Sequence, residues 1–174
     1  EEQFRQALKA DENFAPARYQ LARLAAADGK DAEAVGHLQR VLRSEPGHVP
    51  AALLLAALHS RQARYEQAIQ MVEVAVKARP DLPDLALRLA DLYLKKGRYD
   101  DALARLTPLV AENPGLVRAR LLSGLALLGK YDVDGALKQF ERVRLLEPRL
   151  AINHYYIGRG LLARCGQLGL GGEG

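Results

Sequence analysis

Histidine and cysteine are the side chains of this sequence that could most readily carry acid–base, nucleophilic or metal chemistry. The 174 residues contain four histidines and one cysteine, namely His37, His48, His59, His154 and Cys165. No two of the histidines stand at metal-ligand spacing, and Cys165 has no CxxC partner. We therefore expect the histidines to be packing or surface residues, with no metal site. The single cysteine also excludes an internal disulfide.

Glycine-rich segments are the next candidates, because such loops can hold a phosphate group. No P-loop occurs, and only Gly158-Arg159-Gly160 followed by Ala163 imitates a dinucleotide fingerprint. That fingerprint requires a strand, a turn and a helix, and no such unit surrounds it. The sequence therefore predicts no cofactor and no catalytic constellation, so we expect the protein not to be an enzyme.

Charge and hydropathy narrow the possible partners further. The net charge is +4, and residues 88–174 hold 14 basic and 9 acidic side chains. A basic half permits RNA binding, but aromatic residues make up only 6% of the chain and few could stack on bases. The longest apolar run, Ala51–Leu58, is far shorter than the ~18 residues that span a bilayer. We expect no nucleic acid partner and no membrane span.

The elements that position these residues follow from an internal repeat of 34 residues. A proline, an alanine and a small residue each recur at this step. The prolines are Pro46, Pro80, Pro114 and Pro148, the alanines are Ala34, Ala68, Ala102 and Ala136, and the small residues are Ala22, Ala56, Ala90, Gly124 and Gly158. The proline cannot continue a helix, so it ends each unit.

Each unit is predicted to form two helices, since apolar residues recur at helical spacing within it. Gly29 and Gly97 fall in the turns between them, whereas Gly129 comes earlier, so we expect an irregular fourth turn. The expected first helices cover about 15–27, 49–62, 83–96, 117–128 and 151–164, and the second helices about 31–43, 65–78, 99–111 and 133–146.

The third unit carries the closest match to a known pattern, in Leu89-Ala90-Asp91-Leu92-Tyr93, Gly97-Arg98-Tyr99, Ala102, Leu106 and Pro114. In these residues the sequence resembles the tetratricopeptide repeat (TPR) family, and its Ala-, Leu- and Arg-rich units look like bacterial examples. The family's large aromatic early in the first helix is absent. Arg18, Ala52, Ala86, Arg120 and His154 stand there instead. The resemblance implies an all-α fold, a right-handed α-solenoid of stacked antiparallel helix pairs.

The repeat also predicts the domain organisation. We interpret 1–11 as the second helix of a truncated preceding repeat, 151–165 as a lone terminal helix and 166–174 as a Gly-rich disordered tail. The four full units between them are 15–48, 49–82, 83–116 and 117–150.

The resemblance further implies that the first helices line a concave groove, and helical spacing indicates which side chains point inward. These groove positions are Tyr19, Gln20, Arg23, Leu54, Arg61, Asp84, Arg88, Asp91, Lys95, Arg118, Leu122, Tyr155 and Arg159, with Leu53, Leu87, Leu121 and Leu125 adding apolar contact. Six cations against two acids predict a positive groove for an acidic and apolar peptide. Alternatively, the arginines are solvated and the leucines are partly packed. Chaperone-tail binding is disfavoured. Of the positions that form the family's carboxylate clamp, only Arg88 carries a matching residue in this sequence.

We therefore predict a protein–protein interaction scaffold. The alternative is a regulatory or substrate-recruiting TPR domain of a larger enzyme. The last helix is rather apolar, at Tyr155, Leu161 and Leu162 among others, which truncation of the repeat, or burial of this helix against another chain or domain, would explain. Self-association through this helix is a further hypothesis. The sequence leaves the compartment open, with bacterial cytoplasm and periplasm both compatible.

Overall fold

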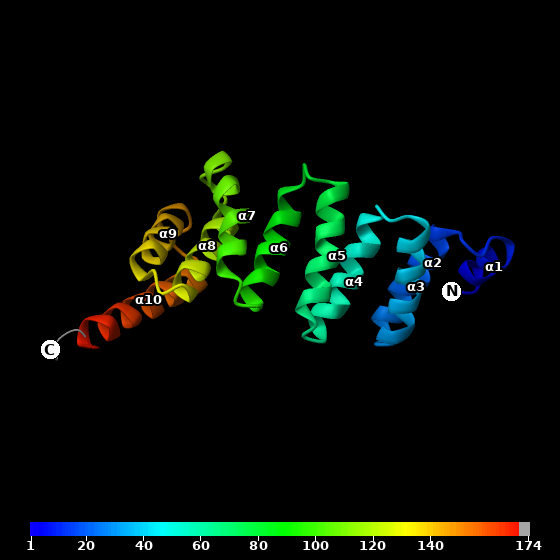
Figure 1. Cartoon of the computed structure of the whole chain (residues 1–174), viewed down its shortest axis with the longest axis horizontal. Coiled ribbons are helices and arrows are strands. Elements are labelled where there is room, and N and C mark those ends of the chain that lie inside the picture. Colours follow the sequence, from blue (N-terminus) through cyan, green and yellow to red (C-terminus); the bar gives the residue numbers. More distant parts are fainter. Residues whose placement is uncertain (171–174) are drawn as a thin grey trace. The chain divides into compact units, whose positions relative to one another are not determined.

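The computed structural model describes the backbone of residues 1–170 and the side chains of residues 1–166, and the described part contains ten helices and no strand. The fold class is the predicted all-α solenoid, and each expected helix is present (Figure 1). The helices are α1 (Glu2–Ala10), α2 (Ala15–Ala27), α3 (Asp31–Ser44), α4 (Val49–Arg61), α5 (Tyr65–Ala78), α6 (Pro83–Lys95), α7 (Tyr99–Glu112), α8 (Val117–Gly129), α9 (Val133–Leu146) and α10 (Ala151–Leu170).

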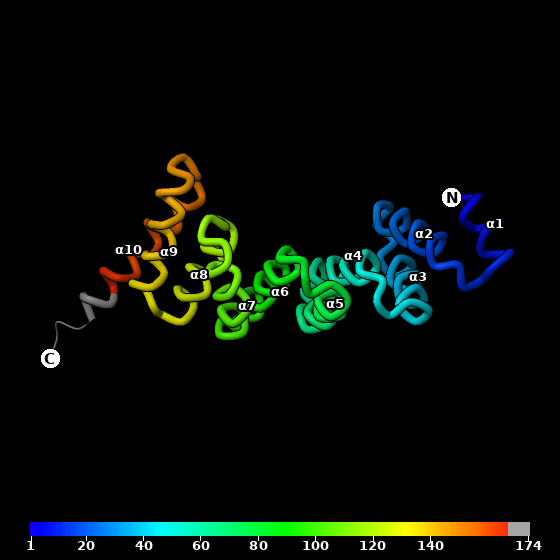
Figure 2. Tube along the Cα trace, turned by 90° about the horizontal axis from the view of Figure 1, so that it is seen from above, coloured from blue at the N-terminus to red at the C-terminus, as the bar shows by residue number. Residues whose placement is uncertain are grey.

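The chain forms two compact units, and the first covers Glu1–Leu85. In this unit α2 packs against α3 and α4 packs against α5, while α3 joins the two pairs by packing on α4. Figure 2 shows α2 and α3 side by side at the blue end of the trace. Ala34, Leu38 and Val41 of α3 are fully buried against Ala22 of α2 and Leu58 of α4. The second helix of one repeat therefore packs between two first helices.

The second unit begins at Ala86 and contains α7 to α10 with most of α6. Here α8 packs against both α7 and α9, and α9 packs against α10. Phe140 is its largest fully buried side chain. Asn153 of α10 is also fully buried, and its amide donates to the Phe140 carbonyl over 2.9 Å. This hydrogen bond fixes the register of α10 on α9.

The turns inside the helix pairs repeat one backbone geometry. Gly29 and Gly97 have φ of 74° and 73°, and at the same 34-residue step Ala63 and Tyr131 have φ of 55° and 63°. The next residue donates its N–H to the carbonyl five residues earlier, as Lys30 does to Ala25 over 2.8 Å. In the fourth turn the corresponding bond, from Asp132 to Leu127, measures 2.9 Å. The expected irregular fourth turn is therefore wrong, because backbone bonds close it although Tyr131 replaces glycine.

Ion pairs tie the first turn of a second helix to the end of the next first helix. Asp31 pairs with Arg61, Asp100 with Lys130, and Asp134 with Arg164, and each pair spans the same sequence separation of 30 residues. All of them are at the surface, where such a pair contributes about 0–1 kcal/mol. Because these pairs recur at the same positions, they help to define the register between repeats, while they add little to the stability of the fold.

Helix α10 continues to Leu170, beyond the lone helix expected at 151–165. The residues 166–170 of the expected tail are thus helical, and the rest of that tail, 171–174, lies outside the described residues.

The small residue that recurs in the first helices allows close packing of the second helix. A Cβ atom placed on Gly124 of α8 would lie 2.3 Å from Cε1 of Phe140 on α9. At the equivalent position of α10, a Cβ on Gly158 would meet no atom within 4 Å. Glycine at this position therefore makes room for a packed aromatic ring in α8, whereas in α10 it faces open space.

This difference predicts opposite effects of one substitution. Gly124→Ala should lower the free energy of unfolding by about 1–3 kcal/mol, because the ring of Phe140 must move out of its packed position. Gly158→Ala should raise it by up to about 1 kcal/mol, since alanine favours the helix and meets no neighbour. Urea unfolding followed by circular dichroism measures both, and equal changes would contradict this account of the packing.

Candidate binding surface

Chemistry by histidine is not supported by the arrangement of the described residues. They contain no group of three His, Cys, Asp or Glu side chains that could hold a metal ion. His48 caps α4, its Nδ1 accepting from the N–H of Ala51 over 3.1 Å, and its ring lies 5.2 Å from that of Tyr19. His154 bonds through Nε2 to the Pro148 carbonyl at 2.7 Å. These two histidines therefore hold local backbone.

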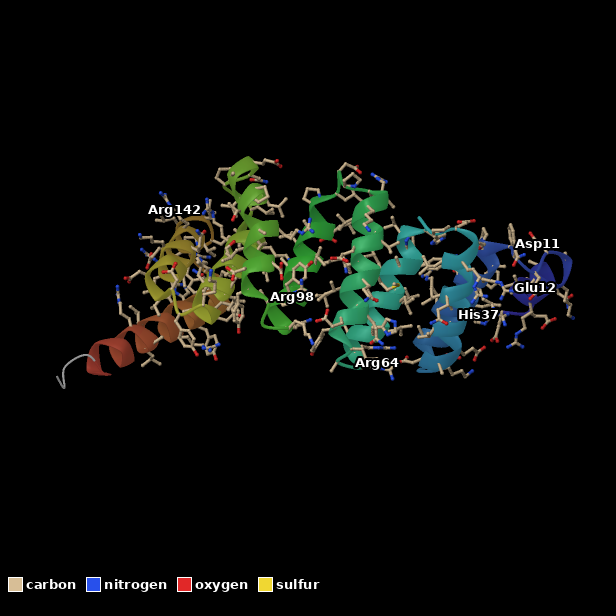
Figure 3. The ribbon with its side chains drawn as sticks, viewed as in Figure 1. Asp11, Glu12, His37, Arg64, Arg98 and Arg142 are labelled. Atoms are coloured by element: carbon tan, nitrogen blue, oxygen red, sulfur yellow. The ribbon has the colours of Figure 1, made fainter. Side chains whose placement is uncertain are left out.

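His37 and His59 lie on α3 and α4 and are both half-buried. Burial lowers the pKa of His37 below its ordinary value, and the positive charge of Arg18 lowers it further. Burial also lowers the pKa of His59, with a contribution from Arg64, and Nδ1 of His59 is buried without a hydrogen-bond partner. Figure 3 labels His37 on α3 and Arg64 in the turn before α5. Both histidines are therefore neutral near pH 7.

In the first unit, the groove positions on α2 form two local groups. Tyr19 packs on the core and against His48, whereas Arg23 is exposed and donates to Oε1 of Gln20 over 3.1 Å. Arg23 forms no ion pair within the described part of the chain. The cation of α2 is thus accessible, while the ring beside it is partly packed.

The remaining groove positions of the first unit differ in their accessibility. Leu54 packs beside the core, and Arg61 is held by the carboxylate of Asp31, to which Gln62 also donates over 3.3 Å. Asp84 is exposed in the first turn of α6. The charge of Arg61 is therefore already paired with a carboxylate of the same chain.

In the second unit, two of the charged groove residues on α6 are paired with each other. Lys95 and Asp91 form an ion pair of 2.9 Å along the helix, and Arg88 is exposed. Just beyond α6, the guanidinium of Arg98 lies 4.6 Å from the ring centre of Tyr93, which is 3% exposed.

The groove positions on α8 and α10 range from buried to open. Leu122 is only 8% exposed and so contributes to the core, whereas Arg118 is exposed. Tyr155 is 59% exposed, with its ring 5.6 Å from that of Tyr156. Arg159 is exposed and, among the residues described, has no ion-pair partner. Within the second unit the accessible groove residues thus include an aromatic ring and a cation.

A recurrent contact that the sequence analysis missed lies at the position where the family has a large aromatic. Arg18 donates through Nε to the Glu12 carbonyl over 2.7 Å, and Arg120 donates likewise to the Pro114 carbonyl over 2.6 Å. His154 reaches the Pro148 carbonyl in the same way, again six residues earlier. Figure 3 labels Glu12 in the loop before α2. The sequence signal for this contact was a polar hydrogen-bond donor that recurs at this one position of the repeat.

A second feature missed from the sequence is a cleft of about 700 Å³ between α9 and α10. Leu137, Lys138 and Arg142 line it from α9, and Ile157 and Leu161 line it from α10. The cleft combines apolar walls with basic and acidic side chains, the acidic ones being Asp134 and Glu141, and none of the groove positions lines it.

The paired helices, their turns and their contacts define an all-α solenoid of two-helix repeats. Family models described as tetratricopeptide repeat match residues 1–48, 25–86 and 61–128, and the chain belongs to the tetratricopeptide repeat family. Repeats of this family generally serve as protein–protein interaction scaffolds and are typically non-catalytic. No curated protein matches the chain in sequence. Among the residues described, no helix has both the length and the apolar character needed to cross a membrane.

Solved structures share the fold at low sequence identity. YrrB, described as a TPR protein with an unusual peptide-binding site, is 23% identical with a TM-score of 0.75, covering 92% of this chain and 83% of that one. MamA from Desulfovibrio magneticus RS-1 is 22% identical with a TM-score of 0.77, covering 86% and 85%. A tetratricopeptide repeat protein from Parabacteroides merdae is 17% identical with a TM-score of 0.82, covering 94% and 65%. At these identities the likeness shows the fold alone.

The buried hydrogen bond of Arg18 leads to a stability prediction. Arg18 is 3% exposed, so Arg18→Ala removes the bond to the loop carbonyl and leaves buried space, and the free energy of unfolding should fall by about 1–3 kcal/mol. Urea unfolding measures the loss. Arg43→Ala, on the exposed face of α3, is the control and should change stability by less than about 0.5 kcal/mol. Equal effects would contradict a role for the loop contact.

The lowered pKa of His59 leads to a prediction about pH. The unfolded chain binds a proton near pH 6.5 more readily than the folded chain does, so the free energy of unfolding should decline as pH falls below about 6.5. His59→Tyr, which copies Tyr93 at the equivalent position, should reduce that decline. Urea unfolding at pH 7.5 and pH 5.5 measures it. An unchanged pH dependence in the variant would show that His59 is not responsible.

Proposed function

We propose that this protein is a non-catalytic scaffold that binds an acidic, partly apolar peptide or protein segment along the groove positions of its first helices. The observation that carries the proposal is the accessible cation in each unit, Arg23 on α2 and Arg159 on α10, exposed and without an ion-pair partner in the described structure. An arginine fork binds a carboxylate through two parallel hydrogen bonds. Both cations are thus available to a partner's Asp or Glu.

Apolar and aromatic surface beside these cations supports the same ligand. Tyr155 lies one helical turn before Arg159 and is 59% exposed, while Tyr19 and Leu54 remain half-buried in the first unit. Aromatic and arginine side chains dominate the binding energy of most protein interfaces. The description of YrrB as a TPR protein with a peptide-binding site is consistent with this use of the fold.

Not every groove position contributes equally to this proposal. Arg61 and Lys95 are already neutralised by Asp31 and Asp91, so a ligand carboxylate would have to compete with those pairs. Leu122 is too buried to contact a ligand without rearrangement. Arg23, Tyr155 and Arg159 are therefore the residues on which we expect affinity to depend most.

Selection of peptides from a random display library against the whole chain tests the proposal. The selected peptides should be enriched in Asp, Glu and apolar residues, and Arg23→Glu or Arg159→Glu should weaken their binding by about 10-fold or more, as measured by calorimetry. Arg105→Glu, an exposed cation on the second helix α7, is the matched control and should leave affinity unchanged. Selected peptides that bind all variants equally would refute binding at the groove positions.

A further inference from the structure

Two pockets of similar size occur at equivalent places in the two units, with volumes of about 410 Å³ and 400 Å³. Each lies between the loop before a first helix and the last turns of the second helix of the same repeat. Glu12, Asn13, Arg18, Arg40, Arg43 and Ser44 line the first, and Pro114, Gly115, Arg120, Arg142, Leu145 and Leu146 line the second. Each residue of the second set stands 102 positions, or three repeats, after one of the first. We call these the loop pockets, and Figure 3 labels Glu12 and Arg142, one residue of each.

Neighbouring repeats do not fill the loop pockets. The pocket of the first unit is open although α4 and α5 follow its repeat, and the pocket of the second unit is open although α6 and α7 precede its repeat. A following repeat is thus present in one case and a preceding repeat in the other. The vacancy is therefore a property of the repeat and does not arise at an end of the chain.

A pair of guanidinium groups recurs in both loop pockets, one from the first helix and one from the second. Arg18 and Arg120 come from first helices, and Arg40 and Arg142 come from second helices. In the two repeats between them, the same positions carry Ala52 with Val74 and Ala86 with Pro108. Both arginines are therefore present together in two repeats and absent together from two others, which indicates a shared role.

The loop hydrogen bond leaves the ends of the first-helix guanidinium groups available. Arg18 and Arg120 each use Nε for a loop carbonyl. Beyond this bond, Nη2 of Arg18 lies 3.6 Å from Oε1 of Glu12, and Nη1 of Arg120 donates to Gln139. His154 makes the same loop contact through an imidazole, so the contact by itself does not require a guanidinium group. Arg18 is 3% exposed, and the loop thus holds its charge in place at the pocket wall.

The side chains that line each loop pocket carry the same net charge. Three arginines and Glu12 line the first pocket, and two arginines with no acidic residue line the second, so the lining charge is +2 in both. Arg40, Arg43 and Arg142 are exposed and form no ion pair within the described residues. These charges are therefore available to an anion.

Charges in the adjoining hollows leave this excess in place. Beside the second pocket, the two carboxylates of the cleft between α9 and α10, Asp134 and Glu141, are each paired with an arginine outside the pocket. Beside the first pocket, the adjoining hollow adds one carboxylate, Glu33, against Arg5 and Lys9. The surroundings therefore do not neutralise either pair of arginines.

A lining charge of +2 complements an anion with nearly two negative charges. A phosphate monoester carries about −1.5 to −2 near pH 7 and has three strong acceptor oxygens, whereas a carboxylate carries one charge on two oxygens. Guanidinium groups bind phosphate through paired hydrogen bonds. Two arginines from different helices can therefore hold separate oxygens of one phosphate group.

We propose that each loop pocket binds a phosphate monoester group, held between the arginine of the first helix and the arginine of the second. The chain thus carries two phosphate sites, one in each unit. This inference does not rest on the groove proposed above, because none of the groove positions lines either pocket.

A titration followed by nuclear magnetic resonance tests both pockets at once. The isotopically labelled whole chain is titrated with inorganic phosphate and, separately, with sodium chloride at equal ionic strength. The backbone amides of Asn13 and Gly115 lie in the two loops and report the two pockets. Phosphate should shift both signals in a saturable manner, and chloride should not. Acetate should bind at least about 10-fold more weakly than phosphate, because it offers fewer charges and oxygens.

Substitution of the second-helix arginines assigns each signal to its pocket. Arg40→Gln should weaken binding reported by Asn13 by about 10-fold or more and leave Gly115 unchanged, because charge-assisted hydrogen bonds are lost only in the first pocket. Arg142→Gln should have the converse effect. Both side chains are exposed, so the fold should be retained. Arg105→Gln, an exposed cation on α7, is the matched control and should change neither signal.

The remaining outcomes decide between this site and its alternatives. Absence of a saturable shift, equal shifts in all variants, or acetate binding as tight as phosphate would overturn the proposal. Arg23→Gln should leave phosphate binding unchanged, so failure of the groove proposal would not affect this one.

A short peptide with blocked ends and one phosphoserine identifies the source of the phosphate group, with the serine peptide as its control. Binding tighter than that of inorganic phosphate would assign the pockets to a phosphorylated side chain of a partner protein. Equal binding would assign them to a free phosphorylated compound. Equal binding of the serine peptide and the phosphoserine peptide would contradict recognition of phosphate.

Discussion

The close approach of a second helix to the small residue of a first helix is the constraint on which this fold depends. Ala22 is fully buried and Ala56 is 4% exposed, and in α8 the ring of Phe140 leaves no room for even one methyl group on Gly124. A two-helix unit buries only part of its apolar surface by itself, so the next first helix covers the rest, as α4 covers α3. Stability is therefore shared between neighbours, and every repeat needs something to pack on.

Most of the fold could be predicted because that constraint acts on residue types that the sequence displays. Pro46 and its equivalents mark where a helix cannot continue, and Ala34 and its equivalents mark where backbones must meet. The fourth turn could not be predicted in this way. Backbone hydrogen bonds close it, and Tyr131 adopts a left-handed φ of 63° that residue type alone does not suggest.

The candidate surface was harder to predict, because the accessibility of a side chain depends on residues far away in the sequence. Arg61 has the spacing of a groove residue, but its charge is neutralised by Asp31 from the preceding second helix. Leu122 has the same kind of spacing and is packed into the core. Arg23 and Arg159 remain accessible because no acidic side chain of the described structure reaches them. Helical periodicity identifies the face of a helix, whereas only the fold decides which of its charges are already paired.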